Sequence, residues 1–364
     1  MSLRKPHPAI ARAEAFCASY GLRIPVLLAP MAGACPASLS IAVAGAGGLG
    51  GCGAVTMQPA AIRAWASEFR AGCRDGSFQL NLWIPEGAPR RDPAVEAAMR
   101  EFLGRWGPRV APEAGDYSRP DFTAQCEALL EAAPAAISSI MGLYPAAFVE
   151  RMKVRGIRWF ATVTTVGEAR LAAAAGCDAI VAQGMEAGGH RGAFDAARAE
   201  SELIGLAALL PAVVDAVEVP VIAAGGITDA RAVAAALILG ASAVSVGTGF
   251  LRCPEARLPR AWADAIGASL PEHTLITRAF SGRPGRSLAT DYARAAAAPG
   301  APPPAAYPVQ SGLTQAMRTR ALEANRLDGM SAWAGQSAAR AQARPAADVA
   351  RELWSGAQAL LDPT

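Results

Sequence analysis

The sequence predicts an α/β protein built on a (β/α)8 barrel, with a smaller helical cap after the eighth strand. Two observations carry this prediction. Short apolar runs bounded by Gly, Pro and Asn recur along the chain, and Ala-rich segments with helical periodicity separate most of them. Strands that alternate with helices form a parallel sheet with right-handed crossovers. Eight such units in about 250 residues fit a closed barrel better than an open doubly wound sheet.

The eight expected strands are short and apolar, and turn-forming residues bound each of them: 26–33, 47–53, 78–84, 136–142, 158–164, 179–184, 219–226 and 243–250. The helices expected between them are 38–46, 59–71, 122–132, 144–155, 166–175, 211–217 and 229–239. Pro59 and Pro211 suit the first turn of a helix, and Gly176 and Gly240 suit the position after its end. Residues 45–50 approach the dinucleotide motif GxGxxG, but no convincing helix follows them.

The barrel should occupy residues 1–251, and a terminal helix within 344–364 should complete its wall. Residues 252–343 leave the last strand at the barrel mouth and should form a helical cap that covers the substrate side. Residues 85–121, rich in Pro and charge, should form an excursion after the third strand with one helix at 93–106.

Composition excludes several classes of protein. Of the 364 residues, 52% are hydrophobic and 18% charged, so a large core is expected and global disorder is not. The net charge of +3 is too small to indicate nucleic acid or an anionic membrane as partner. The seven cysteines are scattered without metal-ligand spacing, which predicts reduced thiols and no metal site. Because we see neither a signal peptide nor a membrane-spanning run, we expect a cytoplasmic protein.

The most informative stretch is QGMEAGGHRGAF at 183–194. His190 stands there among glycines, directly after an apolar run, where a strand-end loop can present it to a ligand. Imidazole titrates near neutrality and is the commonest general base. The stretch therefore predicts a ligand-facing loop with an acid–base residue at its tip. The alternative is a tight turn in which the histidine only bonds its neighbours.

Barrel enzymes carry their sites at the carboxyl ends of the strands. The residues expected at those ends are mostly small, or carry an amide or a hydroxyl: Ala29, Pro30, Met31, Asn81, Gln183–His190, Ala224, Gly225, Gly226, Gly247 and Thr248. Such a lining suits a flat aromatic cofactor. Glycines at the ends of the last two strands predict a phosphate site, where free N–H groups face an anion.

Five segments resemble the nitronate monooxygenase family, flavin enzymes formerly called 2-nitropropane dioxygenases: APMAG at 29–33, LNL at 80–82, QGMEAGGHRG at 183–192, PVIAAGGI at 220–227 and GTGF at 247–250. The resemblance extends from about Pro25 to the terminal helix. It implies an FMN-containing barrel that oxidises alkyl nitronates with O2 to a carbonyl compound and nitrite. Neutral nitroalkanes are further candidate substrates, and we expect a monomer or a homodimer.

The resemblance also implies roles for individual residues. FMN should contact Asn81, Gln183, Gly188, Gly226, Ser245, Val246, Gly247 and Thr248. His190 should be the catalytic residue, and Ser281 with Arg283 should shape the substrate side. The usual Gln at the start of the strand-eight motif is Ser245 here. A nitronate is an electron-rich anion, so His190 could take a proton from a neutral nitroalkane or, when protonated, hold the nitronate oxygens.

Two alternatives stay open. One is an FMN-dependent NAD(P)H reductase, acting on enoyl thioesters or quinones with the same barrel and histidine. The other is a flavin-free barrel that binds phosphorylated sugars. A nucleotide dehydrogenase of the IMP type is disfavoured, because no cysteine lies on a Gly-rich loop after the sixth strand.

Overall fold

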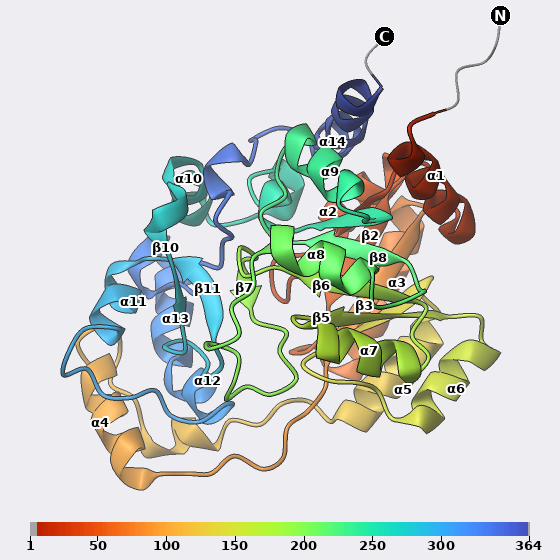
Figure 1. Cartoon of the computed structure of the whole chain (residues 1–364). Helices are drawn as coiled ribbons and strands as arrows, with labels where there is room; N and C mark the ends of the chain where they lie inside the picture. Colours follow the sequence, from red (N-terminus) through yellow and green to blue (C-terminus); the bar gives the residue numbers. More distant parts are fainter. Residues whose placement is uncertain (1–5, 363–364) are drawn as a thin grey trace, which may run out of the picture.

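A computed structural model describes residues 6–362 and shows a closed parallel barrel (Figure 1). Its eight strands, in spatial order, are β1 (Val26–Leu28), β2 (Leu49–Gly53), β3 (Ser77–Trp83), β4 (Ala136–Ile140), β5 (Arg158–Val163), β6 (Ala179–Gln183), β8 (Val221–Ala224) and β9 (Ala243–Val246). Leu27 of β1 pairs with Leu49 on one side and with Ser245 of β9 on the other, which closes the sheet. The predicted α/β class with a TIM-type barrel is confirmed.

Most helices of the outer layer begin and end within two residues of the predicted positions. They are α2 (Ala37–Gly45), α3 (Pro59–Gly72), α5 (Phe122–Ala132), α6 (Ala146–Val154), α7 (Val166–Ala174), α9 (Ala230–Ile238) and the terminal α14 (Ala346–Leu361). Helix α14 packs against α9 and α2, next to β1. Apolar side chains between the strands and these helices form the largest core of the molecule.

One predicted helix was placed wrongly. Helix α8 spans Leu206–Val214, so Pro211 lies inside it rather than in its first turn. The helix begins early because the Glu186 carboxylate accepts hydrogen bonds from the Leu206 N–H at 2.9 and 3.0 Å. The capping residue lies 20 positions upstream. The residues next to the helix therefore contain no sequence signal for its start.

Helix α1 (Pro8–Tyr20), which was not predicted, closes the amino-terminal end of the barrel. Its Phe16 packs in one cluster with Phe160 and with other apolar residues of the barrel strands. The ring of Tyr20 meets the Phe160 ring edge-on, with centroids 5.3 Å apart. The barrel interior is therefore filled at this end, and any ligand must enter from the carboxyl ends.

The residues between β9 and α14 include α10 (Arg260–Ala268), β10 (Thr274–Thr277), β11 (Gly285–Leu288), α11 (Asp291–Ala296), α12 (Val309–Leu313) and α13 (Gln315–Glu323). This segment was predicted to be helical, but it also contains the antiparallel pair β10–β11. Helix α4 (Pro93–Leu103), from the excursion after β3, packs against it in a second apolar core. In Figure 1, α4 accordingly lies beside α11–α13 and away from the barrel.

No helix within residues 6–362 is long and apolar enough to cross a membrane.

The packing at the closed end of the barrel gives a stability prediction. Phe160 is fully buried, so Phe160→Ala should lower the free energy of unfolding by about 3–5 kcal/mol through lost contacts and a cavity. Urea unfolding followed by circular dichroism measures this. Leu171→Ala on α7 is the control, because this side chain is 59% exposed. It should change the free energy of unfolding by no more than about 0.5 kcal/mol. Similar losses in both variants would contradict the placement of Phe160.

Candidate active site

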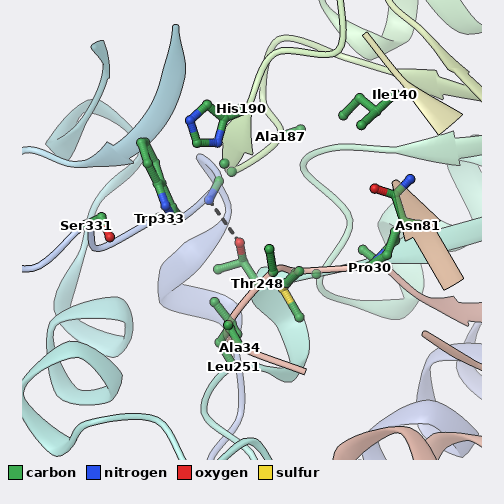
Figure 2. Close-up of a pocket in the computed structure, with 18 of the residues that line it drawn as sticks. Pro30, Ala34, Asn81, Ile140, Ala187, His190, Thr248, Leu251, Ser331 and Trp333 are labelled. Atoms are coloured by element: carbon green, nitrogen blue, oxygen red, sulfur yellow. Dashed lines mark hydrogen bonds between the residues drawn. The ribbon is translucent and has the colours of Figure 1, made fainter. Parts of the chain in front are cut away.

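A cavity of about 470 Å³ opens at the carboxyl ends of the barrel strands (Figure 2). Most of the predicted site residues line it: Ala29, Pro30, Met31, Asn81, Gln183, Gly188, His190, Gly225, Gly226, Ser245, Gly247, Thr248 and Ser281. Two predicted residues lie outside the lining. Val246 is buried in the main core, and Arg283, only 2% exposed, pairs with Glu86 at 2.9 Å.

The sequence predicted that His190 lies at the tip of a ligand-facing loop, and this prediction is wrong. His190 belongs to a two-residue strand, β7 (Gly189–His190), which pairs antiparallel with β11. His190 faces Gly285 in this pairing, and Gly189 faces Arg286. Backbone pairing with a segment about 90 residues downstream, rather than glycine flexibility, therefore sets the position of the histidine.

The His190 ring lies between two tryptophans and meets one hydroxyl. The centroids of Trp83 and Trp333 are each 4.6 Å from that of His190. His190 Nε2 is 2.7 Å from Ser281 Oγ, and Ser281 Oγ is 3.2 Å from both the N and the O of Arg283. One arrangement satisfies all three contacts: Nε2–H donates to Ser281, and Ser281 donates to the Arg283 carbonyl. It leaves the Nδ1 lone pair free to accept a proton.

The surroundings of His190 keep its imidazole neutral. The pKa of His190 is lowered from its usual 6.5 to about 3, first because burial disfavours the charged ring. The guanidinium groups of Arg119, Arg283 and Arg318 lower it further by repulsion. The cavity lining contains Arg119, Arg257 and Arg318 but no Asp or Glu. The site therefore carries positive charge in the absence of any ligand.

Gln183 and Arg191 hold the loop that leads to β7. Gln183 Oε1 accepts from the Gly192 N–H at 2.8 Å, and its Nε2 donates to the His190 carbonyl at 3.0 Å. Arg191, 1% exposed, donates from Nη1 to the Gly184 carbonyl at 2.8 Å. Together with the Glu186 cap, these bonds show that much of the stretch 183–192 shapes the loop. The Gln183 amide keeps one N–H for a ligand.

Asn81 lies on β3 and faces the cavity (Figure 2). Its Nδ2 donates to the carbonyl and to the hydroxyl of Ser138, at 3.1 and 3.0 Å. No residue in the described range 6–362 donates to its Oδ1. This oxygen can therefore accept a hydrogen bond from a bound molecule.

The glycine-rich ends of β8 and β9 form a cradle at one end of the cavity. Gly225 and Gly226 have φ values of +111° and +69°, which other residues rarely adopt. Thr248 Oγ1 accepts from the Gly335 N–H at 3.0 Å, so its own proton is free to donate. Ser337 Oγ donates to the Gly226 carbonyl at 2.8 Å. Free hydroxyl and backbone groups at such strand ends are suited to a phosphate.

Sequence reasoning missed several lining residues. Trp83 had a usable signal, because it lies two positions after Asn81 on the same strand and so shares its face. Arg119, Arg318 and Trp333 come from the two segments outside the barrel, and no local pattern marks them. The same holds for Gly335 and Ser337, which reach the cradle from the last part of the predicted cap.

These residues fit a phosphorylated, flat cofactor. The cradle offers positive-φ glycines and a hydroxyl donor, while Asn81 Oδ1 offers an acceptor along the wall. The lining has no carboxylate that would repel a phosphate or an electron-rich ring. Fold and cavity together define an enzyme of the (β/α)8 class with its site at the carboxyl ends of the strands.

Comparison with known proteins names the family within this class. Residues 15–355 match the sequence model of the family described as nitronate monooxygenase. A nitronate monooxygenase of Pseudomonas aeruginosa is 38% identical over 346 residues, which cover 93% of this chain and 98% of the relative. The chain belongs to the nitronate monooxygenase family, whose members depend on flavin.

Solved structures show the same similarity in three dimensions. Nitroalkane oxidase from Streptomyces ansochromogenes is similar with a TM-score of 0.84 and 34% identity, covering 92% of this chain and 96% of that one. FabK from Thermotoga maritima is similar with a TM-score of 0.74 and 26% identity, covering 95% of this chain and 96% of that one.

The charge around His190 gives a prediction for the ligand-free protein. Its imidazole should stay neutral from about pH 8 down to about pH 5, a range in which an ordinary histidine becomes protonated. Imidazole ¹⁵N chemical shifts measure this, and a His190→Asn variant assigns the signals. A titration midpoint near the usual 6.5 would contradict the proposed effect of burial and of the three arginines.

Proposed function

We propose that this chain oxidises alkyl nitronates with O2, yielding a carbonyl compound and nitrite, with FMN held non-covalently in the cavity. Family membership supports the reaction. The charge of the cavity lining supports the proposal from this chain's own residues. The lining has three arginines and no carboxylate around a neutral histidine. Such a site complements an anionic substrate better than a neutral one.

The FMN phosphate would lie at Gly225, Gly226, Gly247 and Thr248, with Ser245 beside it on β9. The open hydroxyl of Thr248 and the positive-φ glycines support this assignment. Asn81 Oδ1 and the remaining N–H of Gln183 would address the ring, and Pro30, Met31 and Gly188 would flank it. When bound, the flavin supplies electron acceptance from the nitronate carbon and reactivity with O2.

His190 would act through the free lone pair on Nδ1. It can take a proton from a neutral nitroalkane, but the nearby guanidinium groups oppose the charge that this creates. A substrate that arrives as the nitronate needs no such transfer and offsets the positive charge. The geometry therefore favours nitronates, with neutral nitroalkanes as poorer substrates. Ser281 is a positioning residue, because it holds Nε2.

Residues 252–343 would serve as a cap on the barrel formed by 1–251 and 344–364. Phe280, Ser281, Ser311 and Trp333 from this segment line the cavity beside His190, which supports that role. The cap would exclude water from the substrate side and position Ser281. Its contacts with α4 suggest that the excursion after β3 acts with it as one unit.

An FMN-dependent NAD(P)H reductase remains the second candidate. Three lining residues favour it, because Leu258, Trp262 and Leu322 offer apolar surface beside Arg257.

One experiment tests both candidates. O2 consumption and nitrite release are measured with ethylnitronate, nitroethane and NADH, for the wild type and His190→Asn. We expect ethylnitronate to be by far the best wild-type substrate. The variant should lose nitroethane turnover by about 10²–10⁴-fold, as expected for a missing general base, and ethylnitronate turnover much less. Cofactor released by heat should be FMN.

Rapid NADH oxidation with little nitronate-dependent O2 uptake would support the reductase instead. Equal retention of both nitro activities in His190→Asn, at unchanged flavin content, would remove His190 from the mechanism.

A further inference from the structure

Arg119 occupies a distinctive place in the cavity. It lies in the excursion after β3, between the short helix η1 (Pro112–Asp116) and α5, and it lines the cavity. Its guanidinium carbon is 4.9 Å from the centroid of the Trp83 ring and 5.0 Å from that of Tyr307. Because Trp83 packs against His190, the charge of Arg119 lies one aromatic ring away from the histidine.

The guanidinium of Arg119 lacks the partners that the neighbouring arginines have. Its Nε and Nη1 are buried and make no hydrogen bond within the described part of the chain. Arg283, in contrast, pairs with Glu86 at 2.9 Å. Arg318 donates to the Ser311 carbonyl at 2.8 Å and to Thr314 Oγ1 at 3.2 Å.

A buried guanidinium N–H without a hydrogen-bond partner is costly, and native proteins rarely keep one without a role. The rings of Trp83 and Tyr307 stabilise the guanidinium charge from above and below its plane, but they leave its in-plane N–H donors unused. A planar guanidinium presents parallel donors that match the two oxygens of a planar anion. The missing partner of Arg119 therefore has the chemistry of a small oxyanion.

We propose that Arg119 binds the nitronate group of the substrate beside His190 and makes the site prefer nitronates to neutral nitroalkanes. This inference rests on the proposed function. It gives the task of holding the anion to a permanent cation, which leaves the neutral imidazole of His190 free to accept a proton. Trp83 and Tyr307 hold the guanidinium in place for this contact.

Nitrate, which shares the planar O–N–O geometry of the nitronate group, probes this site without turnover. Titration of the flavin-loaded protein is followed by the indole NMR signal of Trp83. Arg119→Gln should raise the Kd for nitrate by about 10- to 100-fold, as expected when a charged hydrogen-bond donor is lost, and Arg119→Lys by less. Arg105→Gln is the control, because Arg105 also lies over a ring, that of Phe102 at 4.9 Å, but outside the cavity lining.

Kinetics with ethylnitronate supply the second measurement. Arg119→Gln should raise KM by a factor similar to that for Kd, with a much smaller change in kcat/KM for nitroethane. Nitrate affinity equal in wild type and Arg119→Gln would overturn the assignment, even if nitronates are oxidised. Loss of nitrate binding in Arg119→Gln, in a wild-type protein that does not oxidise nitronates, would support the anion site and reject the proposed function.

Discussion

The pairing of β7 with β11 is the contact on which the site depends. It joins a loop of the barrel to the segment after β9, and His190 lies at the junction. The backbone of His190 faces Gly285, while its side chain bonds Ser281 of the same segment. A Cβ at Gly285 would lie 3.0 Å from Trp333 and 3.1 Å from the His190 Cα, so a larger residue there would require these neighbours to shift by a few tenths of an ångström. Without this pairing, the histidine would lose both its direction and its hydroxyl partner.

The charge of the cavity follows from the same arrangement. Folding brings Arg119, Arg283 and Arg318 around an imidazole that burial already keeps neutral. Only Arg283 has a carboxylate partner at bonding distance among the residues described. Such unbalanced charge lowers the stability of the free protein, and functional sites commonly carry costs of this kind. An anionic substrate offsets the charge, so the feature that destabilises the empty site also selects its ligand.

The sequence predicted those features of the fold and the site that depend on local residue patterns. Alternating strands and helices identified the barrel, and the glycines around 183–192 marked the stretch that contains His190. Long-range contacts set the remainder. Neither the start of α8, capped by Glu186, nor the strand pairing of His190 has a local signal. The core shared by α4 and α11–α13 joins segments almost 200 residues apart, and Arg119, which follows α4 in the same excursion, lines the cavity. Inspection of β3 could have found Trp83 but not Arg119.

The protonation of His190 with and without nitrate tests the central claim most directly. If the guanidinium groups of Arg119, Arg283 and Arg318 add to the effect of burial in keeping the imidazole neutral, a bound anion should raise the pKa of His190 above about 3. By linkage, nitrate should then bind more tightly as the pH falls. The ¹⁵N shifts of the imidazole report both effects in one titration. A pKa that nitrate leaves unchanged, with a Kd independent of pH, would contradict the account.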